Sequence, residues 1–310
     1  MFQDDLYIIG DFGGTHARVA YAKNGSILLE RVFLYQDSES PIHLIRSFMT
    51  EHAEKFPAQD AIFAFAGPVI NDMIKMTNLN FYSSADELKK ELGLRHVKLI
   101  NDFAAQVAAI PYLDQNDISW VDGFQADPSV TPYVVLGPGT GLGVGYSAYG
   151  QVVASEGGGI SFSPYDDFEI GLWHFLKKTF KEQLIAEIIL SGKGLSRLYQ
   201  YISKEEEIVL PEVICEMAHK GHAFAKEAYL RFFLILARYA GDMALAIGAK
   251  AVYLAGGILP RPEVISLLDA EDFRHAFSNK YARDYMLKDM PVGIVLRKHA
   301  ALLGLSKMNI

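Results

Sequence analysis

Short apolar runs that end at glycine turns open the chain. Residues 6–9, Leu-Tyr-Ile-Ile, stand directly before the segment "GDFGGTHAR" at residues 10–18, and this pattern predicts a buried strand followed by a tight turn. Residues 17–21 and 27–34 are predicted as two further strands, joined by a hairpin turn at Asn24-Gly25. A glycine turn between two strands excludes the dinucleotide-binding fingerprint and the Walker loop, because both lead from a strand into a helix.

The same arrangement recurs 125 residues later. The segment "GGTHARVAYAKNGSIL" at residues 13–28 lies over "PGTGLGVGYSAYGQVV" at residues 138–153 without a gap, so that Gly14-Thr15 matches Gly139-Thr140. An apolar strand precedes each copy and a β-hairpin follows it, which predicts an internal duplication. Glycine amides and a threonine hydroxyl can cradle an anion, so two such turns across a cleft suit a polyphosphate.

Helices that alternate with short apolar strands follow each hairpin. After the first hairpin we expect helices at 41–56, 85–92 and 103–110 and strands at 61–66, 73–76 and 97–100, with a capping box at Ser84 and Glu87. After the second we expect helices at 168–180, 182–190, 211–248 with breaks at Gly221 and Gly241, from 262 onward and at 298–308, and strands at 251–255 and 292–296. This order predicts two α/β domains with mixed central sheets around a cleft. The smaller would comprise residues 1–110 with the closing helix 298–310, and the larger residues 111–297.

Composition narrows the function classes. Of 310 residues, 50% are hydrophobic and 21% charged, and the formal net charge is −8, which argues against a nucleic acid or an anionic membrane as partner. No apolar stretch reaches the length of about 20 residues that a membrane span needs, and the acidic start "MFQDD" is unlike a secretory signal. A single cysteine, Cys215, excludes an internal disulfide and fits a cytoplasmic location.

Two carboxylates follow predicted strands and are candidates for chemistry. Asp11 precedes the first glycine turn and could hold Mg²⁺ through water; the alternative is an aspartate that bonds its own backbone in the turn. Asp102 follows Asn101 at the end of the strand at 97–100, the edge where α/β sheets bind ligands. Asp102 could take the proton from an attacking hydroxyl in a phosphoryl transfer, whereas the simpler alternative is capping of the next helix by Asn101 or Asp102.

Two further clusters have alternatives of their own. Glu156 is followed by three glycines at 157–159, which allow a small ligand to approach the backbone, and the apolar flanks disfavour a flexible linker. Cys215, His219 and His222 would share one helical face, and a metal site there competes with ordinary packing. Packing is favoured, because no second cysteine or paired-cysteine motif supports a metal.

Eight segments occur in the order found in bacterial glucokinases, which belong to the hexokinase and actin-like ATPase superfamily. They are "GDFGGTHAR", "MTNLNF", "INDFAA", "IP", "GPGTGLGVG", "EGGG", "LSGKGLSRLY" and "AGGILPR". The chain resembles that family from about residue 7 to residue 304. The resemblance implies two actin-like ATPase (ribonuclease H-like) domains with mixed sheets that flank a cleft, in agreement with the duplication.

The resemblance also implies roles for individual residues. It implies that ATP and Mg²⁺ bind at Asp11, Gly13, Gly14, Thr15, Arg18, Gly137, Gly139, Thr140, Gly141, Gly256 and Gly257, with Asp11 near the magnesium ion. It implies that the sugar binds at Asn78, Asn101, Asp102, Glu156, Gly159 and Glu187, and that Asp102 deprotonates the sugar 6-hydroxyl. The chain departs from the family at Ala104, where threonine is frequent, and at Gly159, where the family usually has a histidine that helps to bind the sugar.

These observations predict an ATP-dependent hexose kinase, foremost a glucokinase, that transfers the γ-phosphoryl group to the sugar 6-hydroxyl. Because Gly159 replaces the histidine, a kinase for another hexose or a hexosamine (mannose, glucosamine or an N-acetylhexosamine) is the first alternative. A non-catalytic sugar-sensing regulator and a filament-forming actin-like ATPase are alternatives of other classes. The expected partner is glucose or a related hexose, and the resemblance is compatible with a homodimer.

Overall fold

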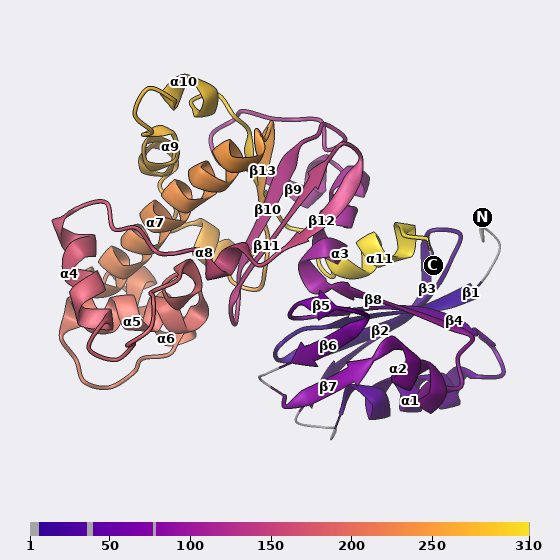
Figure 1. Cartoon of the computed structure of the whole chain (residues 1–310). Helices are drawn as coiled ribbons and strands as arrows, with labels where there is room; N and C mark the ends of the chain where they lie inside the picture. The colour runs from indigo at the N-terminus through magenta and orange to yellow at the C-terminus, as the bar shows by residue number, and fades with distance from the viewer. Residues whose placement is uncertain (1–5, 36–39, 77–78, 310) are drawn as a thin grey trace.

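The first sheet begins with the predicted N-terminal hairpin (Figure 1). The computed structural model describes residues 6–35, 40–76 and 79–309. The strands of this sheet are β1 (Leu6–Phe12), β2 (His16–Lys23), β3 (Ser26–Leu34), β4 (Asp60–Phe65) and β8 (His96–Asn101). Their spatial order is β3-β2-β1-β4-β8, with antiparallel pairs in the hairpin and parallel pairs from β1 to β4 and from β4 to β8.

The second sheet repeats this topology, which confirms the predicted duplication. Its strands are β9 (Ile118–Trp120), β10 (Tyr133–Pro138), β11 (Leu142–Ala148), β12 (Gln151–Ser155), β13 (Ala251–Leu254) and β14 (Val292–Val295). In the order β12-β11-β10-β13-β14, an antiparallel hairpin is again continued by parallel strands, and β9 adds an antiparallel edge. A third, smaller sheet consists of β5 (Val69–Ile70), β6 (Met73–Met76) and β7 (Phe81–Ser84).

The two copies differ by one residue in the glycine turn. Phe12 pairs with Ala17 across four turn residues, whereas Pro138 pairs with Leu142 across three. The gapless alignment therefore holds for the second and third strands of each hairpin, and the first strand is shifted by one position. The hairpin turns at Asn24-Gly25 and at residues 149–150 match closely, since both residues of each turn have positive φ, as a type I′ turn requires.

Alternate residues of the central strands face different layers. The helices are α1 (Pro41–His52), α2 (Ala85–Leu92), α3 (Asp102–Ala109), α4 (Asp167–Leu176), α5 (Gly192–Ser203), α6 (Pro211–His219), α7 (Ala223–Ile247), α8 (Pro262–Ile265), α9 (Ala270–Ser278), α10 (Asp284–Leu287) and α11 (Ala300–Lys307). In β10, Val134 and Leu136 belong to a core with α5, α6, α7 and α9, whereas Tyr133 and Val135 face α3. Helices α1 and α2 cover the outer face of the first sheet, and α3 and α11 lie between the two sheets (Figure 1).

Several details of the predicted second half are wrong, and the helix expected at 168–180 ends four residues early, at Leu176. Residues 182–190 form no α-helix: Ile185 makes a β-bridge with Ser161, and only a 3₁₀ turn follows at Ala186–Ile188. Helix α5 was not predicted, and it begins at Gly192 because the Ser191 side chain caps it by accepting from the Gly194 nitrogen. Gly241 lies inside the continuous helix α7, where a Cβ would overlap the carbonyl oxygen of a residue in α9. The capping box at the start of α2 and the break at Gly221 are confirmed, whereas α1 ends four residues earlier than predicted.

Candidate active site

The first glycine turn lies beside a buried ion pair. Asp11 is 7% exposed in β1, two residues before the turn that contains Gly13, Gly14 and Thr15. Its partner across the β1–β2 ladder is Arg18, whose Nη1 donates to Asp11 Oδ2 at 3.0 Å. Burial raises the pKa of Asp11, and the positive charge of Arg18 opposes that rise. Two residues predicted for nucleotide binding are therefore paired with each other.

The second glycine turn packs against the turn at Gly256-Gly257. A Cβ on Gly137 would lie 3.1 Å from the nitrogen of Gly256, and a Cβ on Gly139 would lie 3.8 Å from the nitrogen of Gly257. Gly256 has a φ of +90°, which L side chains rarely adopt. The structure thus brings the segment at 137–141, which contains Thr140, close to Gly256 and Gly257, which are also predicted for ATP binding.

Glu187 connects this second turn to the predicted sugar site. Its Oε2 accepts a hydrogen bond from the Leu142 nitrogen at 2.9 Å, and a Cβ on Gly141 would overlap the same carboxylate. Arg197 of α5 interacts electrostatically with the negative charge of Glu187, and its Nη1 donates to the carbonyl oxygen of Ile188 at 2.7 Å. Arg197 lies within the segment "LSGKGLSRLY", and no role was predicted for it. The signal that could have indicated a role for Arg197 is its position three residues after Gly194.

Asp102 stands at the carboxyl edge of the first sheet. It is the first residue of α3, directly after β8, and β8, β4 and β1 run parallel with Asn101, Phe65 and Phe12 in register. Burial raises the pKa of Asp102 to about 8, and the negative charges of Asp11 and Glu156 contribute to the rise. Asp11 and Asp102, predicted from separate motifs, therefore share one electrostatic environment.

Asn101 caps helix α3. Its Oδ1 accepts hydrogen bonds from the nitrogens of Phe103 and Ala104 at 2.8 and 3.2 Å, and its Nδ2 donates to the carbonyl oxygen of Gly67 at 3.0 Å. The capping alternative therefore describes the Asn101 side chain. Contact with a sugar is left to the second hydrogen of its amide group.

The glycines after Glu156 form a 3₁₀ turn at Gly157–Gly159. A Cβ on Gly158 would overlap the carbonyl oxygen of Leu142, so this glycine allows close contact with β11. A Cβ on Gly159 would meet nothing within 4 Å, so the departure from the family leaves open space. The negative charge of Glu187, together with burial, raises the pKa of Glu156. Asn78, also predicted for the sugar site, lies outside the described residues.

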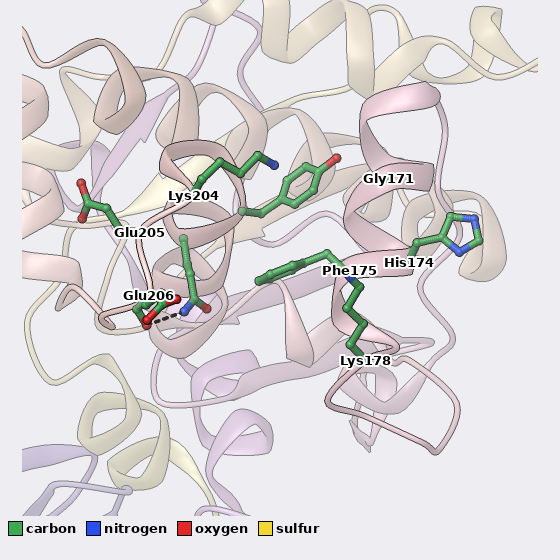
Figure 2. Close-up of a pocket in the computed structure, with 9 residues that line it drawn as sticks. Gly171, His174, Phe175, Lys178, Lys204, Glu205 and Glu206 are labelled. Atoms are coloured by element: carbon green, nitrogen blue, oxygen red, sulfur yellow. Dashed lines mark hydrogen bonds between the residues drawn. The ribbon is translucent and has the colours of Figure 1, made fainter.

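A pocket away from these residues lies between α4 and the end of α5 (Figure 2). Its volume is about 430 Å³, and it is lined by Gly171, His174, Phe175, Lys178, Gln200, Tyr201, Lys204, Glu205 and Glu206. None of the residues predicted for ATP or sugar binding lines it, so it forms no part of the candidate active site.

The alternative metal cluster is not formed. Cys215 is buried in α6, His219 Nε2 lies 2.8 Å from the carbonyl oxygen of Glu263, and His222 precedes α7 and contacts aromatic rings. Over the described ranges, no group of three or more histidine, cysteine, aspartate or glutamate side chains could hold a metal ion. The packing interpretation is therefore confirmed for Cys215, whereas His219 and His222 are exposed.

Comparison with known proteins decides the family. The Glucokinase family model matches residues 8–309. The chain belongs to the glucokinase family. The glucokinase of Helicobacter acinonychis (strain Sheeba) is 33% identical over 317 residues, which cover 96% of this chain and 93% of that protein. The glucokinase of Caulobacter vibrioides (strain NA1000 / CB15N) is 34% identical over 313 residues, with coverage of 96% and 93%. The crystal structure of glucokinase from an Antarctic psychrotroph has a TM-score of 0.82 at 29% identity and covers 98% of both chains.

Membership in this family confirms two of the predictions. The fold consists of two actin-like ATPase domains with mixed sheets, and the protein is a hexose kinase. No helix in the described part of the chain is both long and apolar enough to cross a membrane.

Proposed function

We propose that this kinase transfers the γ-phosphoryl group of ATP to the 6-hydroxyl of glucose, with Asp102 as the general base. The observation that carries the proposal is the Asp102 carboxyl, whose pKa of about 8 makes it a far stronger base than an exposed aspartate. It stands at the sheet edge next to Asp11 and Glu156, which come from the predicted phosphate and sugar segments. A base at that place can take the hydroxyl proton as the oxygen attacks phosphorus.

The two glycine turns would bind the phosphates. A Cβ on Gly139 would lie 3.8 Å from the Gly257 nitrogen, so these two turns come close together, and a polyphosphate could approach their main-chain amides without glycine side chains in the way. Asp11 fits Mg²⁺, because carboxylate oxygens with water are the ligands that this ion prefers. Magnesium bound there would neutralise phosphate charge. Arg18 would then orient the Asp11 carboxylate and add a second positive charge.

Three side chains would orient the sugar. Glu156 and Glu187 would accept hydrogen bonds from sugar hydroxyls, and the second amide hydrogen of Asn101 would donate one. The solved structures of glucokinase from Balamuthia mandrillaris in complex with glucose and of a ROK family glucokinase from Streptomyces griseus in complex with glucose and AMPPNP support glucose as the phosphoryl acceptor and ATP as the phosphoryl donor.

A hexose panel tests the proposal. ADP release is followed with ATP and Mg²⁺ on glucose, mannose, glucosamine and N-acetylglucosamine. Asp102→Asn should lower turnover about 10²- to 10⁴-fold while sugar binding persists, because only the proton acceptor is lost. Asp289→Asn is the matched control, because it makes the same substitution at an exposed aspartate of the larger domain and should leave turnover unchanged. Absence of sugar-stimulated ADP release from folded protein would refute the kinase reaction, and undiminished turnover in Asp102→Asn would refute the base.

A hexosamine or another hexose is the second candidate substrate, favoured by the open space at Gly159. The space would admit a substituent that a histidine side chain excludes. Gly159→His should then lower the KM for glucose about 2- to 10-fold, the effect of one added hydrogen bond, and raise the KM for the bulkier sugar. Equal preference in both variants would contradict a role for this position in specificity. Sugar binding without any turnover would favour the regulator.

Three further statements stay predictions. We propose the division into residues 1–110 with 298–310 and residues 111–297, which is supported by the packing of α11 on β1 and α3. A cytoplasmic location fits the single cysteine. A homodimer is compatible with the resemblance, and light scattering would measure the oligomeric state.

A further inference from the structure

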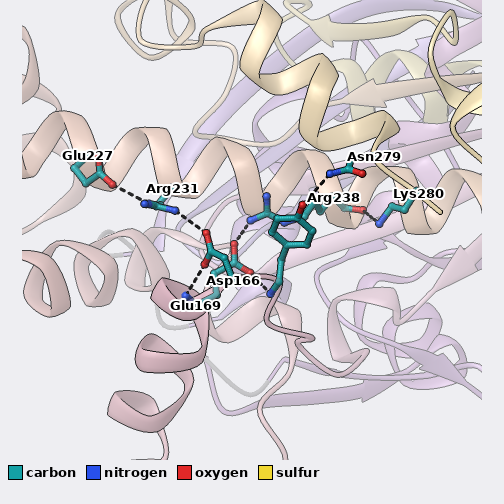
Figure 3. Close-up of polar contacts among 8 residues, drawn as sticks. Asp166, Glu169, Glu227, Arg231, Arg238, Asn279 and Lys280 are labelled. Carbon is teal, nitrogen blue, oxygen red and sulfur yellow. Dashed lines mark hydrogen bonds and ion pairs between the residues drawn. The ribbon is translucent and has the colours of Figure 1, made fainter.

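Helix α7 holds the segment that follows Glu156 at three successive points. Tyr239 donates from its hydroxyl to the carbonyl oxygen of Gly157 at 2.6 Å. One residue earlier in the helix, Arg238 forms an ion pair with Glu169, and two turns further back Arg231 donates to Asp166 at 3.0 Å (Figure 3). A helix of 25 residues thus connects the turn at 157–159 to the start of α4.

The ion pair in this network is rigidly held. Glu169 is fully buried, and its second oxygen accepts a hydrogen bond from the Tyr165 nitrogen at 2.9 Å. The guanidinium carbon of Arg238 lies 4.8 Å from the centre of the Tyr165 ring, and Lys280 donates to the carbonyl oxygen of Arg238 at 3.1 Å (Figure 3). An ion pair in which both oxygens of the buried carboxylate accept hydrogen bonds restrains the geometry of both partners. Tyr239 therefore extends from a part of α7 that cannot easily shift.

The three glycines of the turn contribute no side-chain contacts that would fix its backbone conformation. Three consecutive glycines have the largest backbone freedom of any residues, and no side chain projects from them to pack. The Gly157 nitrogen donates to Ser155 Oγ at 3.0 Å, and the Gly157 carbonyl accepts from the Ile160 nitrogen at 2.8 Å as well as from Tyr239. Gly157 and Gly158 pack closely on Val144 and Leu142 of β11, and the Tyr239 hydroxyl adds a hydrogen bond to the turn from a residue 82 positions away in the chain.

We propose that Tyr239 is a positioning residue for sugar binding, whose hydroxyl fixes the Gly157 carbonyl and so holds the Glu156 carboxylate in place for the sugar hydroxyls. The inference rests on the proposed function of Glu156 and adds a residue that touches neither substrate. Tyr239 is only 8% exposed, so it acts through the turn. Because Gly159 supplies no side chain to the sugar, the geometry of Glu156 carries more of the binding.

Tyr239→Phe removes only the hydroxyl and leaves the ring packed. The KM for glucose and the dissociation constant for glucose from calorimetry should both rise about 2- to 10-fold, while the KM for ATP and the kcat at saturating glucose stay near the wild-type values. The matched control is Tyr253→Phe, since the buried Tyr253 hydroxyl has no hydrogen-bond partner among the described residues and its loss should leave the binding of both ligands unaffected.

The outcomes separate the inference from the proposed function. Unchanged glucose affinity in Tyr239→Phe, measured against a wild-type protein that binds glucose, would overturn the positioning role. Equal weakening of glucose and ATP binding would also overturn it, because a general loss of structure affects both ligands. If the wild-type protein bound no hexose of the panel, the proposed function would fail first.

Discussion

Replacing Asp102 by asparagine should stabilise the folded protein, and increasingly so as the pH rises. The carboxyl is ionised in the unfolded chain above its ordinary pKa of 3.8, whereas in the folded protein it keeps its proton up to a pKa of about 8. Folding at neutral pH therefore requires that Asp102 take up a proton. An amide requires none, and its oxygen can still accept the hydrogen bond that the Phe103 nitrogen donates to Asp102 Oδ1 at 3.0 Å.

The size of the effect follows from the two pKa values. Proton binding by the folded state stabilises the wild-type protein fully below pH 3.8, and this contribution is lost as the pH rises toward 8. Within that window the wild-type free energy of unfolding falls by about 1.4 kcal/mol per pH unit relative to Asp102→Asn. Between about pH 6 and pH 7.5 the advantage of the variant should therefore grow by about 2 kcal/mol.

Urea denaturation of both proteins at several pH values measures this difference directly. Asp289→Asn serves as the control, because the Asp289 side chain is exposed to solvent in the folded protein as it is in the unfolded chain. The stability of this variant should therefore change with pH in the same way as that of the wild-type protein. A variant whose advantage stays constant from pH 6 to 7.5 would show that Asp102 titrates normally. The explanation of its strength as a base would then be withdrawn.

Three glycine substitutions test the packing around the site. Gly158→Ala should lower the free energy of unfolding by about 1–3 kcal/mol, because its Cβ would overlap the main-chain oxygen of Leu142, whereas Gly159→Ala next to it faces open space and should stay within about 0.5 kcal/mol of wild type. Gly304→Ala should cost about 1–3 kcal/mol, because its Cβ would overlap the carbonyl oxygen of Ala105 where α11 crosses α3. Urea denaturation checks all three, and equal stability of the two neighbouring alanine variants would contradict the packing argument.

The duplicated hairpins could be predicted because their turns are local. A type I′ turn needs positive φ at two residues, a conformation that asparagine and glycine readily adopt at Asn24-Gly25. In the second copy glycine occupies the second position, and Tyr149 before it also has positive φ. Each such turn fixes the register of its strands within a few residues. The paired glycine turns at 13–15 and 139–141 then followed from the same local chemistry, and so did their nearness to the carboxyl edges of the sheets.

The errors come from contacts between distant segments. Gly194 disfavours a helix by its own propensity, yet α5 includes it because a Cβ there would overlap the main chain at Ile189. Gly241 is likewise kept inside α7 by close contact with Phe277 of α9. The sequence pattern predicts only a core aromatic residue at Tyr239, because its hydrogen-bond partner Gly157 lies 82 residues earlier in the chain. Propensity and spacing carry no information about such pairs.

The cost to folding and the proposed catalysis have one origin. An aspartate at its ordinary pKa holds a proton too weakly to assist the removal of a proton from a sugar hydroxyl, and proton transfer is most effective when the base has a pKa near the working pH. Burial at the end of β8, with Asp11 and Glu156 nearby, moves Asp102 into that range and at the same time makes its charged form unfavourable in the folded protein. The carboxylate charges that raise this pKa belong to the residues proposed to bind magnesium and sugar. Positive charge beside Asp11 and hydroxyl donors on Glu156 would therefore stabilise the ionised base, so that Asp102 becomes able to accept a proton when both substrates are in place.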